Sequence, residues 1–388
     1  MFYKKLYNEL MSDYAKRALD KHKQLRGKIS VELKAPIEGQ EDLSIYYTPG
    51  VAAVSSYVAD NPDQAGEYTW LNNNVAVISD GSAVLGLGNI GPYGSLPVME
   101  GKSMLFKHFA GIDAVPIILD VHSADEIVSA VKAIAPSFGG INLEDIAAPI
   151  CFEVEDRLKD ELTIPVMHDD QHGTAIVVLA GLINATKLVN KKLDDTKIVV
   201  VGAGAAGVAI AKLIKEYSKA EIIAVDSKGI IHSQRDNLNG SKQALLELTN
   251  PNDIQGSLNE ALHDADIFIG VSQPALLTDE MIQTMSDDAI IFAMANPTPE
   301  IMPDIAKKAG AAIVATGRSD FPNQVNNALA FPGIFRGALD NKVSRITEEH
   351  KVAAAEVIAS LVENPTPDNI IPAIGDDRLV PSIAEIIR

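Results

Sequence analysis

Residues 197–226, KIVVVGAGAAGVAIAKLIKEYSKAEIIAVD, decide the fold of this 388-residue chain. The apolar run at 197–201 predicts a buried strand, and the apolar spacing after it predicts a helix that ends near Tyr217. A second strand is predicted at 221–225. Three glycines lie between the first strand and the helix, namely Gly202, Gly204 and Gly207. Because this GxGxxG string joins a strand to a helix, it predicts a dinucleotide-binding βαβ unit.

The turn and the end of the second strand supply candidates for cofactor binding. Glycine lets the pyrophosphate approach the backbone, and the helix N-terminus faces the phosphates. Asp226 follows the second glycine by 22 positions, where a carboxylate accepts hydrogen bonds from the adenosine ribose. A 2′-phosphate would meet like charge there, which favours NAD over NADP, although Lys228 softens the preference. These candidates are Gly202, Gly204, Ala205, Ala206, Gly207 and Asp226.

The rest of the pattern alternates predicted strands and helices, which indicates parallel sheets covered on both faces. Strands predicted at 265–271, 289–295 and 311–315 extend the βαβ unit into a Rossmann-like, doubly wound sheet. Ligands of such sheets bind outside the carboxyl ends of the strands, where this chain has Ser272 and Asn296. Strands predicted near 74–80, 114–120 and 138–147 precede this unit and predict a second parallel sheet. The fold class is α/β.

Two acidic pairs follow apolar runs in the middle of the chain. Glu144 and Asp145 stand in the string INLEDI, and Asp169 and Asp170 stand in HDDQHGTA before a long apolar helix. Carboxylates without Cys or His make a hard oxygen site, which suits Mg²⁺ or Mn²⁺. Aspartate is also common at helix starts, so a cap role for Asp169 beside a solvated Asp170 stays open at this point.

Composition and charge narrow the function classes. The chain has 33 basic and 52 acidic residues, and its net charge of -19 argues against nucleic acid or an anionic membrane as a partner. The single cysteine, Cys151, excludes an intramolecular disulfide and favours a reducing compartment. No run reaches the roughly 20 apolar residues of a membrane span, and no secretory signal is visible. We expect a cytoplasmic protein with a small-molecule substrate.

Three other segments place polar side chains beside predicted turns or helix starts. SIYYTPGVA carries Tyr47 before a Pro-Gly break that predicts a helix start. The glycine-rich segment 81–102 ends at Lys102, where an apolar helix is predicted to begin, so this lysine is either solvated or a tuned amine. FPNQVNNALAFPG holds Asn326 and Asn327, which cap backbone or hold a carboxylate.

Seven strings, in this order along the chain, resemble the malic enzyme family over most of its length. They are YYTPGVA (46–52), SDGSAVLGLGNIGPYGSLPVMEGK (79–102), INLEDI (141–146), HDDQHGTA (168–175), VGAGAAG (201–207), ANPTPE (295–300) and PNQVNNALAFPG (322–333). The length resembles that of the compact bacterial type, which has no added acyltransferase-like domain.

The resemblance implies roles for single residues. Tyr47 is the implied general acid, and Lys102 the implied general base, supported by Asp169. Three carboxylates are implied as ligands of Mg²⁺ or Mn²⁺, namely Glu144, Asp145 and Asp170. Three amides are implied at the substrate, namely Asn296, Asn326 and Asn327. A lysine base must be neutral near pH 7, which neighbouring aspartates oppose, so Lys102 is expected to act only with the metal bound.

The implied activity is oxidative decarboxylation of L-malate to pyruvate and CO₂ with reduction of NAD(P), by a homodimer. The alternative within the family is a metal-dependent oxaloacetate decarboxylase. A third reading, a nucleotide-sensing or amino-acid-dehydrogenase-like protein, treats the acidic pairs as caps. The expected domains are 1–170 for substrate and metal, 171–335 for NAD, and helices at 336–388 that pack back on the first. Larger family members carry a substrate arginine where this chain has Ala83.

Overall fold

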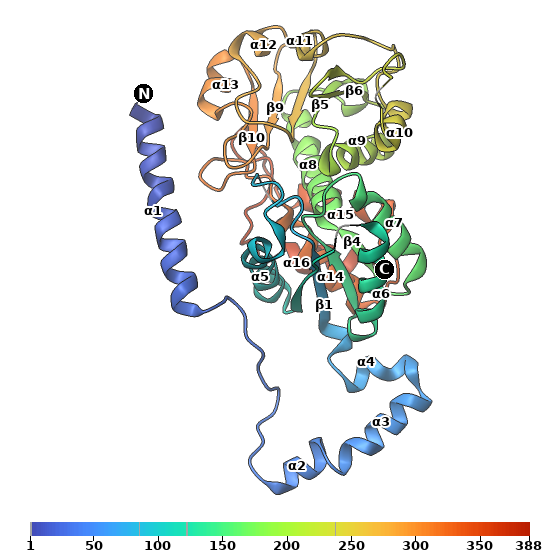
Figure 1. Ribbon diagram of the computed structural model, residues 1–388. Coiled ribbons are helices and arrows are strands. Elements are labelled where there is room, and N and C mark those ends of the chain that lie inside the picture. The colour runs from blue at the N-terminus through green and yellow to red at the C-terminus, as the bar shows by residue number, and fades with distance from the viewer. Residues whose placement is uncertain (1, 85, 122, 237) are drawn as a thin grey trace.

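The computed structural model describes residues 2–84, 86–121, 123–236 and 238–388, with side chains from residue 13 onward. Its body contains two sheets, one above the other, joined by a long central helix (Figure 1). The first sheet has four parallel strands in the order β2-β1-β3-β4. These strands are β1 (Asn74–Ser79), β2 (Asp113–Ile118), β3 (Gly140–Leu143) and β4 (Val166–His168).

Alternation along β1 explains why helices cover both faces of this sheet. Val75 and Val77 belong to one hydrophobic cluster, which includes residues of α5 (Gly91–Ala110). Ala76 and Ile78 point into another cluster, with residues of α6 (Ala124–Ile134) and α7 (Ile150–Glu161). Side chains of a strand alternate between its faces, so an all-apolar strand must be buried on both.

The second sheet has the order β10-β9-β8-β5-β6-β7, and every neighbouring pair is parallel except β6 and β7. Its strands are β5 (Lys197–Val201), β6 (Glu221–Asp226), β7 (Gly229–Ile230), β8 (Ile267–Gly270), β9 (Ile290–Ala293) and β10 (Ile313–Thr316). Its helices are α9 (Ala205–Tyr217), α10 (Gly240–Leu248), α11 (Leu258–Leu262), α12 (Asp279–Gln283) and α13 (Pro303–Ala309). The predicted α/β class and the doubly wound second sheet are confirmed.

Each glycine of the turn between β5 and α9 is explained by a different feature of the structure. Gly202 has a φ of +116°, a conformation that L side chains rarely adopt. A Cβ on Gly207 would lie 1.7 Å from the carbonyl oxygen of Gly202, so only glycine lets the helix pack there. A Cβ on Gly204 would meet no atom within 4 Å, and the space beside that residue is open.

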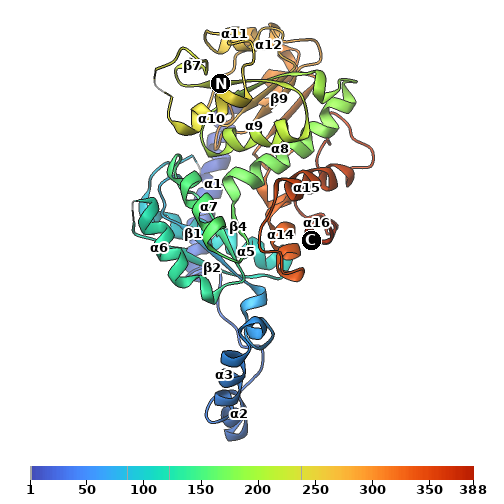
Figure 2. The same ribbon diagram turned by 90° about the vertical axis from the view of Figure 1, so that its right-hand side faces the viewer.

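The central helix α8 (Asp169–Leu188) connects the two sheets and is buried along most of its length. It packs against α9 and α15 (Glu348–Ser360), while α14 (Phe331–Asp340) packs against α5 and α16 (Leu379–Ile386). The ring of Phe106 contacts those of Phe331 and Phe335, with centroids 4.6 and 5.3 Å apart. Of the C-terminal helices, α14 therefore packs on α5 beside the first sheet, whereas α15 packs on α8 and α9 (Figure 2).

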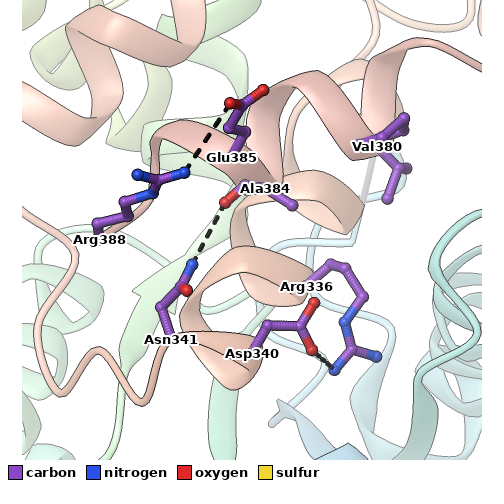
Figure 3. Close-up of a pocket in the computed structure, with 8 residues that line it drawn as sticks. Arg336, Asp340, Asn341, Val380, Ala384, Glu385 and Arg388 are labelled. Carbon is purple, nitrogen blue, oxygen red and sulfur yellow. Dashed lines mark hydrogen bonds and ion pairs between the residues drawn. The ribbon is translucent and has the colours of Figure 1, made fainter.

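A shallow hollow lies between α14 and α16 (Figure 3). Its charged side chains are paired with one another, Arg336 with Asp340 at 2.6 Å and Arg388 with Glu385 at 3.9 Å. Asn341 donates to the carbonyl oxygen of Ile387 at 2.8 Å, which fastens the end of the chain to α14. The hollow is thus part of the packing of the C-terminal helices.

The N-terminal segment lies outside this body. It contains α1 (Phe2–Leu25), α2 (Gln40–Tyr46), α3 (Gly50–Asp60) and α4 (Ala65–Tyr68). No residue of α2 or α3 is buried, although α3 is largely apolar, with the sequence GVAAVSSYVAD. Both views show α2 and α3 projecting beyond the first sheet (Figures 1 and 2). We call residues 29–70 the arm.

Several local expectations were wrong. Helix α5 begins at Gly91, so Lys102 lies in its interior and does not start a helix. The helix begins earlier because proline suits the first helical turn, where its missing N–H has no partner to lose. Helices α2 and α7 were not predicted. Among the described residues, no helix combines the length and apolar composition needed to cross a membrane.

We predict that Asn184→Leu destabilises the protein by about 2 kcal/mol or more. The buried Asn184 Nδ2 donates to the carbonyl oxygens of Ala359 at 2.8 Å and Ile370 at 3.0 Å, and leucine would leave both without this donor. Urea denaturation followed by circular dichroism measures the change. Asn259→Leu, at an exposed position of α11, is the control and should stay within about 0.5 kcal/mol of the unchanged protein. Equal losses in both variants would contradict the assignment.

Candidate active site

Lys102 lies at the centre of the acidic residues that the sequence singled out. Its Nζ is 2.8 Å from Glu144 Oε1 and 2.5 Å from Asp169 Oδ2. Glu144 directly follows β3, and Asp169 directly follows β4 as the first residue of α8. The carboxyl ends of parallel strands meet at one edge of a sheet, which brings these residues together. The lysine side chain is 7% exposed and that of Asp169 0%, so the ion pairs are shielded from solvent.

The surroundings of Lys102 keep it charged. Burial alone would lower its pKa, but Asp169 and Glu144 outweigh burial, and the pKa of Lys102 is raised above its usual value. The ring of Phe331, from α14, lies 4.2 Å from Nζ and adds a cation–π contact. As the structure stands, Lys102 is an ammonium group that serves as counterion to the carboxylates.

Two more acidic residues, Asp170 and Asp145, lie beside the carboxylates that contact Lys102. Asp170 Oδ2 accepts a hydrogen bond from the backbone N–H of Asp145 at 2.7 Å, which joins the two acidic pairs. Burial raises the pKa of Glu144 well above its usual range, opposed by Lys102 and increased further by Asp170, Asp169 and Asp145. The cluster therefore carries excess negative charge that a further cation would relieve.

The residues beside Lys102 supply oxygen donors of the kind that a hard divalent cation binds. Buried oxygens without a hydrogen-bond partner remain at Asp169 Oδ1 and Asn142 Oδ1, beside carboxylates that repel one another. Oxygen ligands of this kind suit Mg²⁺ or Mn²⁺. Within the described parts of the chain, no three acidic, His or Cys side chains already converge as a coordination sphere. The alternative that Asp169 is the N-cap of α8 is wrong, because His168 holds that position. Asp169 is wholly buried and forms an ion pair with Lys102.

The glycine-rich segment of the first sheet meets the strand ends of the second. A Cβ on Gly86, whose φ is +70°, would lie 2.3 Å from the carbonyl oxygen of Asn296, which follows β9. The side chain of Asn296 lies against Gly317, which follows β10. The acidic edge of the first sheet and the strand ends of the second sheet therefore share a boundary.

The other residues considered for substrate binding make different local contacts. Asn326 accepts a hydrogen bond from Ala328 N at 2.9 Å, so its side-chain oxygen caps a short helix. The Cβ of Asn327 lies close to Gly173 of α8, one turn beyond Asp169. Ala83 is exposed, and its N–H donates to the carbonyl oxygen of Asp145 at 2.9 Å. Only its backbone is close to the acidic pair, so this position offers no charged group to a carboxylate.

The nucleotide candidates lie together at the second sheet. Gly204 is the N-cap of α9, and Ala205 and Ala206 form its first turn. Gly202 N donates to the carbonyl oxygen of Val225 at 2.9 Å, which places the turn beside Asp226. Ser272 N donates to Glu300 Oε1 at 3.0 Å, after β8.

Tyr47 is not brought to Lys102 within one chain. It is the C-cap of α2, on the arm, and its side chain is 70% exposed. The arm leaves the body on the far side of β1 from the second sheet (Figure 1). A catalytic role for Tyr47 at the Lys102 of the same chain is therefore not supported by this arrangement.

Two buried carboxylates were missed by the sequence reading. Glu155 of α7 accepts from His168 N at 2.9 Å and contacts His172 Nε2 at 2.8 Å and Lys159 Nζ at 2.7 Å. It thereby fixes the start of α8, where the acidic pair lies. Glu300 accepts from Ser272 N and Ala295 N, both at 3.0 Å, and fixes the loops after β8 and β9. The positions of Glu155 and Glu300 in the sequence do not distinguish them from exposed acidic residues.

The fold and site define an α/β protein in which a Rossmann-like sheet adjoins a buried lysine–carboxylate centre. Residues 26–159 match the malic enzyme N-terminal domain, and residues 171–386 match the malic enzyme NAD-binding domain. The chain belongs to the malic enzyme family, which confirms the resemblance drawn from its motifs.

Three relatives show the extent of the similarity. The chain is 54% identical over 373 residues to the bifunctional malic/malolactic enzyme of Bacillus subtilis, covering 95% of this chain and 91% of that one. It is 48% identical over 366 residues to the NADP-dependent malic enzyme of Halomonas elongata, covering 93% and 86%. The crystal structure of the NAD-dependent malic enzyme of Thermotoga maritima matches with a TM-score of 0.93 at 50% identity, covering 95% and 98%.

We predict that His172 makes stability fall as pH falls from about 6.5 towards 4. Burial lowers the pKa of His172 from 6.5 to about 4, although Glu155 opposes the change. The unfolded chain then binds a proton in this window that the folded chain does not, at a cost of up to about 1.4 kcal/mol per pH unit.

Urea denaturation at several pH values between 7.5 and 5 measures this slope. His172→Gln should reduce it, and the exposed His263→Gln should leave it unchanged. An unaltered slope in His172→Gln would mean that this histidine is not the group responsible.

Proposed function

We propose that the chain oxidises L-malate and decarboxylates it to pyruvate, with NAD or NADP as hydride acceptor and Mg²⁺ or Mn²⁺ at Glu144, Asp145 and Asp170. The observation that carries this proposal is the buried Lys102 between Glu144 and Asp169, within excess negative charge, at an edge that meets the nucleotide sheet. Membership of the malic enzyme family supports it.

Bound NAD(P) would take the hydride from C2, and a divalent cation would polarise the C2 oxygen so that loss of CO₂ from C3 has an electron sink. The chain supplies proton transfer and orientation. Lys102 takes the proton of the C2 hydroxyl, and Tyr47 returns a proton to C3 of the enolate. Asn296 and Asn327 hold the substrate carboxylate, and the partly engaged Asn326 supports them with its amide nitrogen.

Lys102 can act as a base only when the neighbouring carboxylates no longer stabilise its protonated form. Asp169 and Glu144 raise its pKa here, so the lysine stays protonated while it is their only cation. Carboxylates engaged as metal ligands attract the ammonium less, which lowers its pKa towards the working range. Activity of this lysine therefore depends on the metal ligands.

We propose further that the enzyme is a homodimer in which the arm supplies Tyr47 to the partner's site. The arm has no buried residue in α2 or α3, and exposes Ile45, Val51, Val54 and Tyr57. Apolar surface of this extent is typical of subunit contacts. We also propose that residues 1–170 and 171–335 form two domains and that the protein is cytoplasmic. Residues 336–388 were expected on the first domain, but α15 within them packs on α8 and α9.

We expect metal-dependent formation of NADH or NADPH from L-malate, with an equal amount of pyruvate. Asp170→Asn should lower this rate, and pyruvate release from oxaloacetate, by about 100-fold or more. Gly204→Val should abolish malate oxidation and spare the decarboxylation of oxaloacetate, since its side chain fills open space beside the α9 N-terminus.

Initial rates followed at 340 nm, beside a pyruvate assay with oxaloacetate alone, measure both reactions. Pyruvate formation from oxaloacetate with negligible malate oxidation would favour a decarboxylase. An unchanged Mn²⁺ requirement in Asp170→Asn would refute the placement of the metal.

A heterodimer of Tyr47→Phe and Asp170→Asn chains should recover about half of the normal activity, because one of its two sites has both residues intact. Each variant alone should be nearly inactive, with a loss of about 100-fold or more for the missing acid. Two affinity tags allow the heterodimer to be purified after co-expression.

The matched control is Tyr47→Phe paired with the unchanged chain, which keeps one intact site whichever subunit supplies the tyrosine. An inactive Tyr47→Phe/Asp170→Asn heterodimer beside an active control would show that each chain completes its own site. A monomer mass by light scattering would exclude the dimer.

A further inference from the structure

Glu155 is a buried carboxylate to which the proposed reaction gives no role. It lies in α7, and its side chain is 4% exposed. Its Oε1 accepts a hydrogen bond from the backbone N–H of His168 at 2.9 Å and lies 2.7 Å from Lys159 Nζ. Its Oε2 lies 3.3 Å from Gln171 Nε2 and 2.8 Å from His172 Nε2. Both oxygens therefore join α7 to the first turn of α8.

The contacts with α8 lie on one side of that helix. Gln171 and His172 follow His168 by three and four positions, which is the spacing of neighbours on one helix face. Asp169 and Asp170 are rotated from His168 by about 100° and 200° around the helix axis. These two acids make the contacts of the acidic centre. A rotation of the start of α8 would thus move both acids, and Glu155 opposes it.

The chain offers no strand that could replace Glu155 as the acceptor of the His168 N–H. His168 ends β4, which is the edge strand of the first sheet. Burial would raise the pKa of Glu155, but His172 and Lys159 lower it well below its usual range, so the group is ionised at neutral pH. An ionised carboxylate accepts on both oxygens, whereas a glutamine would turn an NH₂ group towards one set of these donors.

We infer that Glu155 is a positioning residue for the metal site, because it fixes the first turn of α8 and thereby the places of Asp169 and Asp170. This inference rests on the proposed function, in which Asp170 is a metal ligand. A carboxylate binds a cation well only where its oxygens are held in the right orientation. Groups that orient the ligands from behind typically change metal affinity by about 10- to 100-fold when they are removed.

Titration calorimetry with Mn²⁺ alone, without substrate or nucleotide, tests the inference. Glu155→Gln should weaken Mn²⁺ binding by about 10- to 100-fold, and Glu155→Asp, which keeps the charge on a shorter side chain, by about 10-fold. Lys159→Met should leave the affinity nearly unchanged, because the contacts of Glu155 with α8 remain.

Glu300→Gln is the matched control for a loss that is merely structural. Glu300 is also a buried carboxylate that accepts from two backbone N–H groups, but it does so in the loops after β8 and β9. In urea denaturation it should lose stability much as Glu155→Gln does, while its Mn²⁺ affinity stays that of the unchanged protein.

Unchanged Mn²⁺ affinity in Glu155→Gln and Glu155→Asp, or an equal loss in Glu300→Gln, would overturn the inference and leave the proposed function standing. No Mn²⁺ binding by the unchanged protein, or binding that survives in Asp170→Asn, would overturn the inference together with the proposed metal site. A selective loss in the Glu155 variants of a protein that does not oxidise malate would uphold the inference and refute the proposed function.

Discussion

The buried ion pairs of Lys102 with Glu144 and Asp169 are the constraint on which the site depends. They join α5, the end of β3 and the start of α8, and the ring of Phe331 adds α14 to the same centre. A buried carboxylate is costly unless it is paired. Glu144, Asp145 and Asp169 are buried and Lys102 contacts two of them, while Asp170 lies at their border, so this geometry is suited to a cation as well as to proton transfer.

Helix α8 connects the Lys102 centre to the second sheet. Its first turn holds Asp169 and Asp170, and its later turns pack on α9, which begins at the glycine turn. The contact of Gly86 with Asn296 closes the same boundary from the other side. Glu155 and Glu300 hold backbone N–H groups at these two edges. The chemistry of the acid and that of the dinucleotide are thereby aligned by packing, and not by neighbouring positions in sequence.

The arm has the opposite character. Its helices are well formed, but their apolar side chains face solvent, and Tyr47 lies among them. Burying such a surface on a second copy would release it from water and complete the site in one step. The stability of the arm and the activity of the enzyme would then both depend on assembly.

The sequence by itself determined the βαβ unit, the second parallel sheet and the acidic residues at the strand ends, because these depend on local spacing: apolar periods, glycines in a turn, and acids after a strand. It left Lys102 open between a solvated residue and a tuned amine. Only the tertiary structure decided that Lys102 is a buried counterion inside α5, that Tyr47 stands apart from it, and that Arg235 and Lys242 neutralise Asp226. The first and third of these depend on groups that are distant in the chain, and the second depends on the exposed surface of the arm. The charge state of a side chain follows from what packs around it and not from its neighbours in sequence.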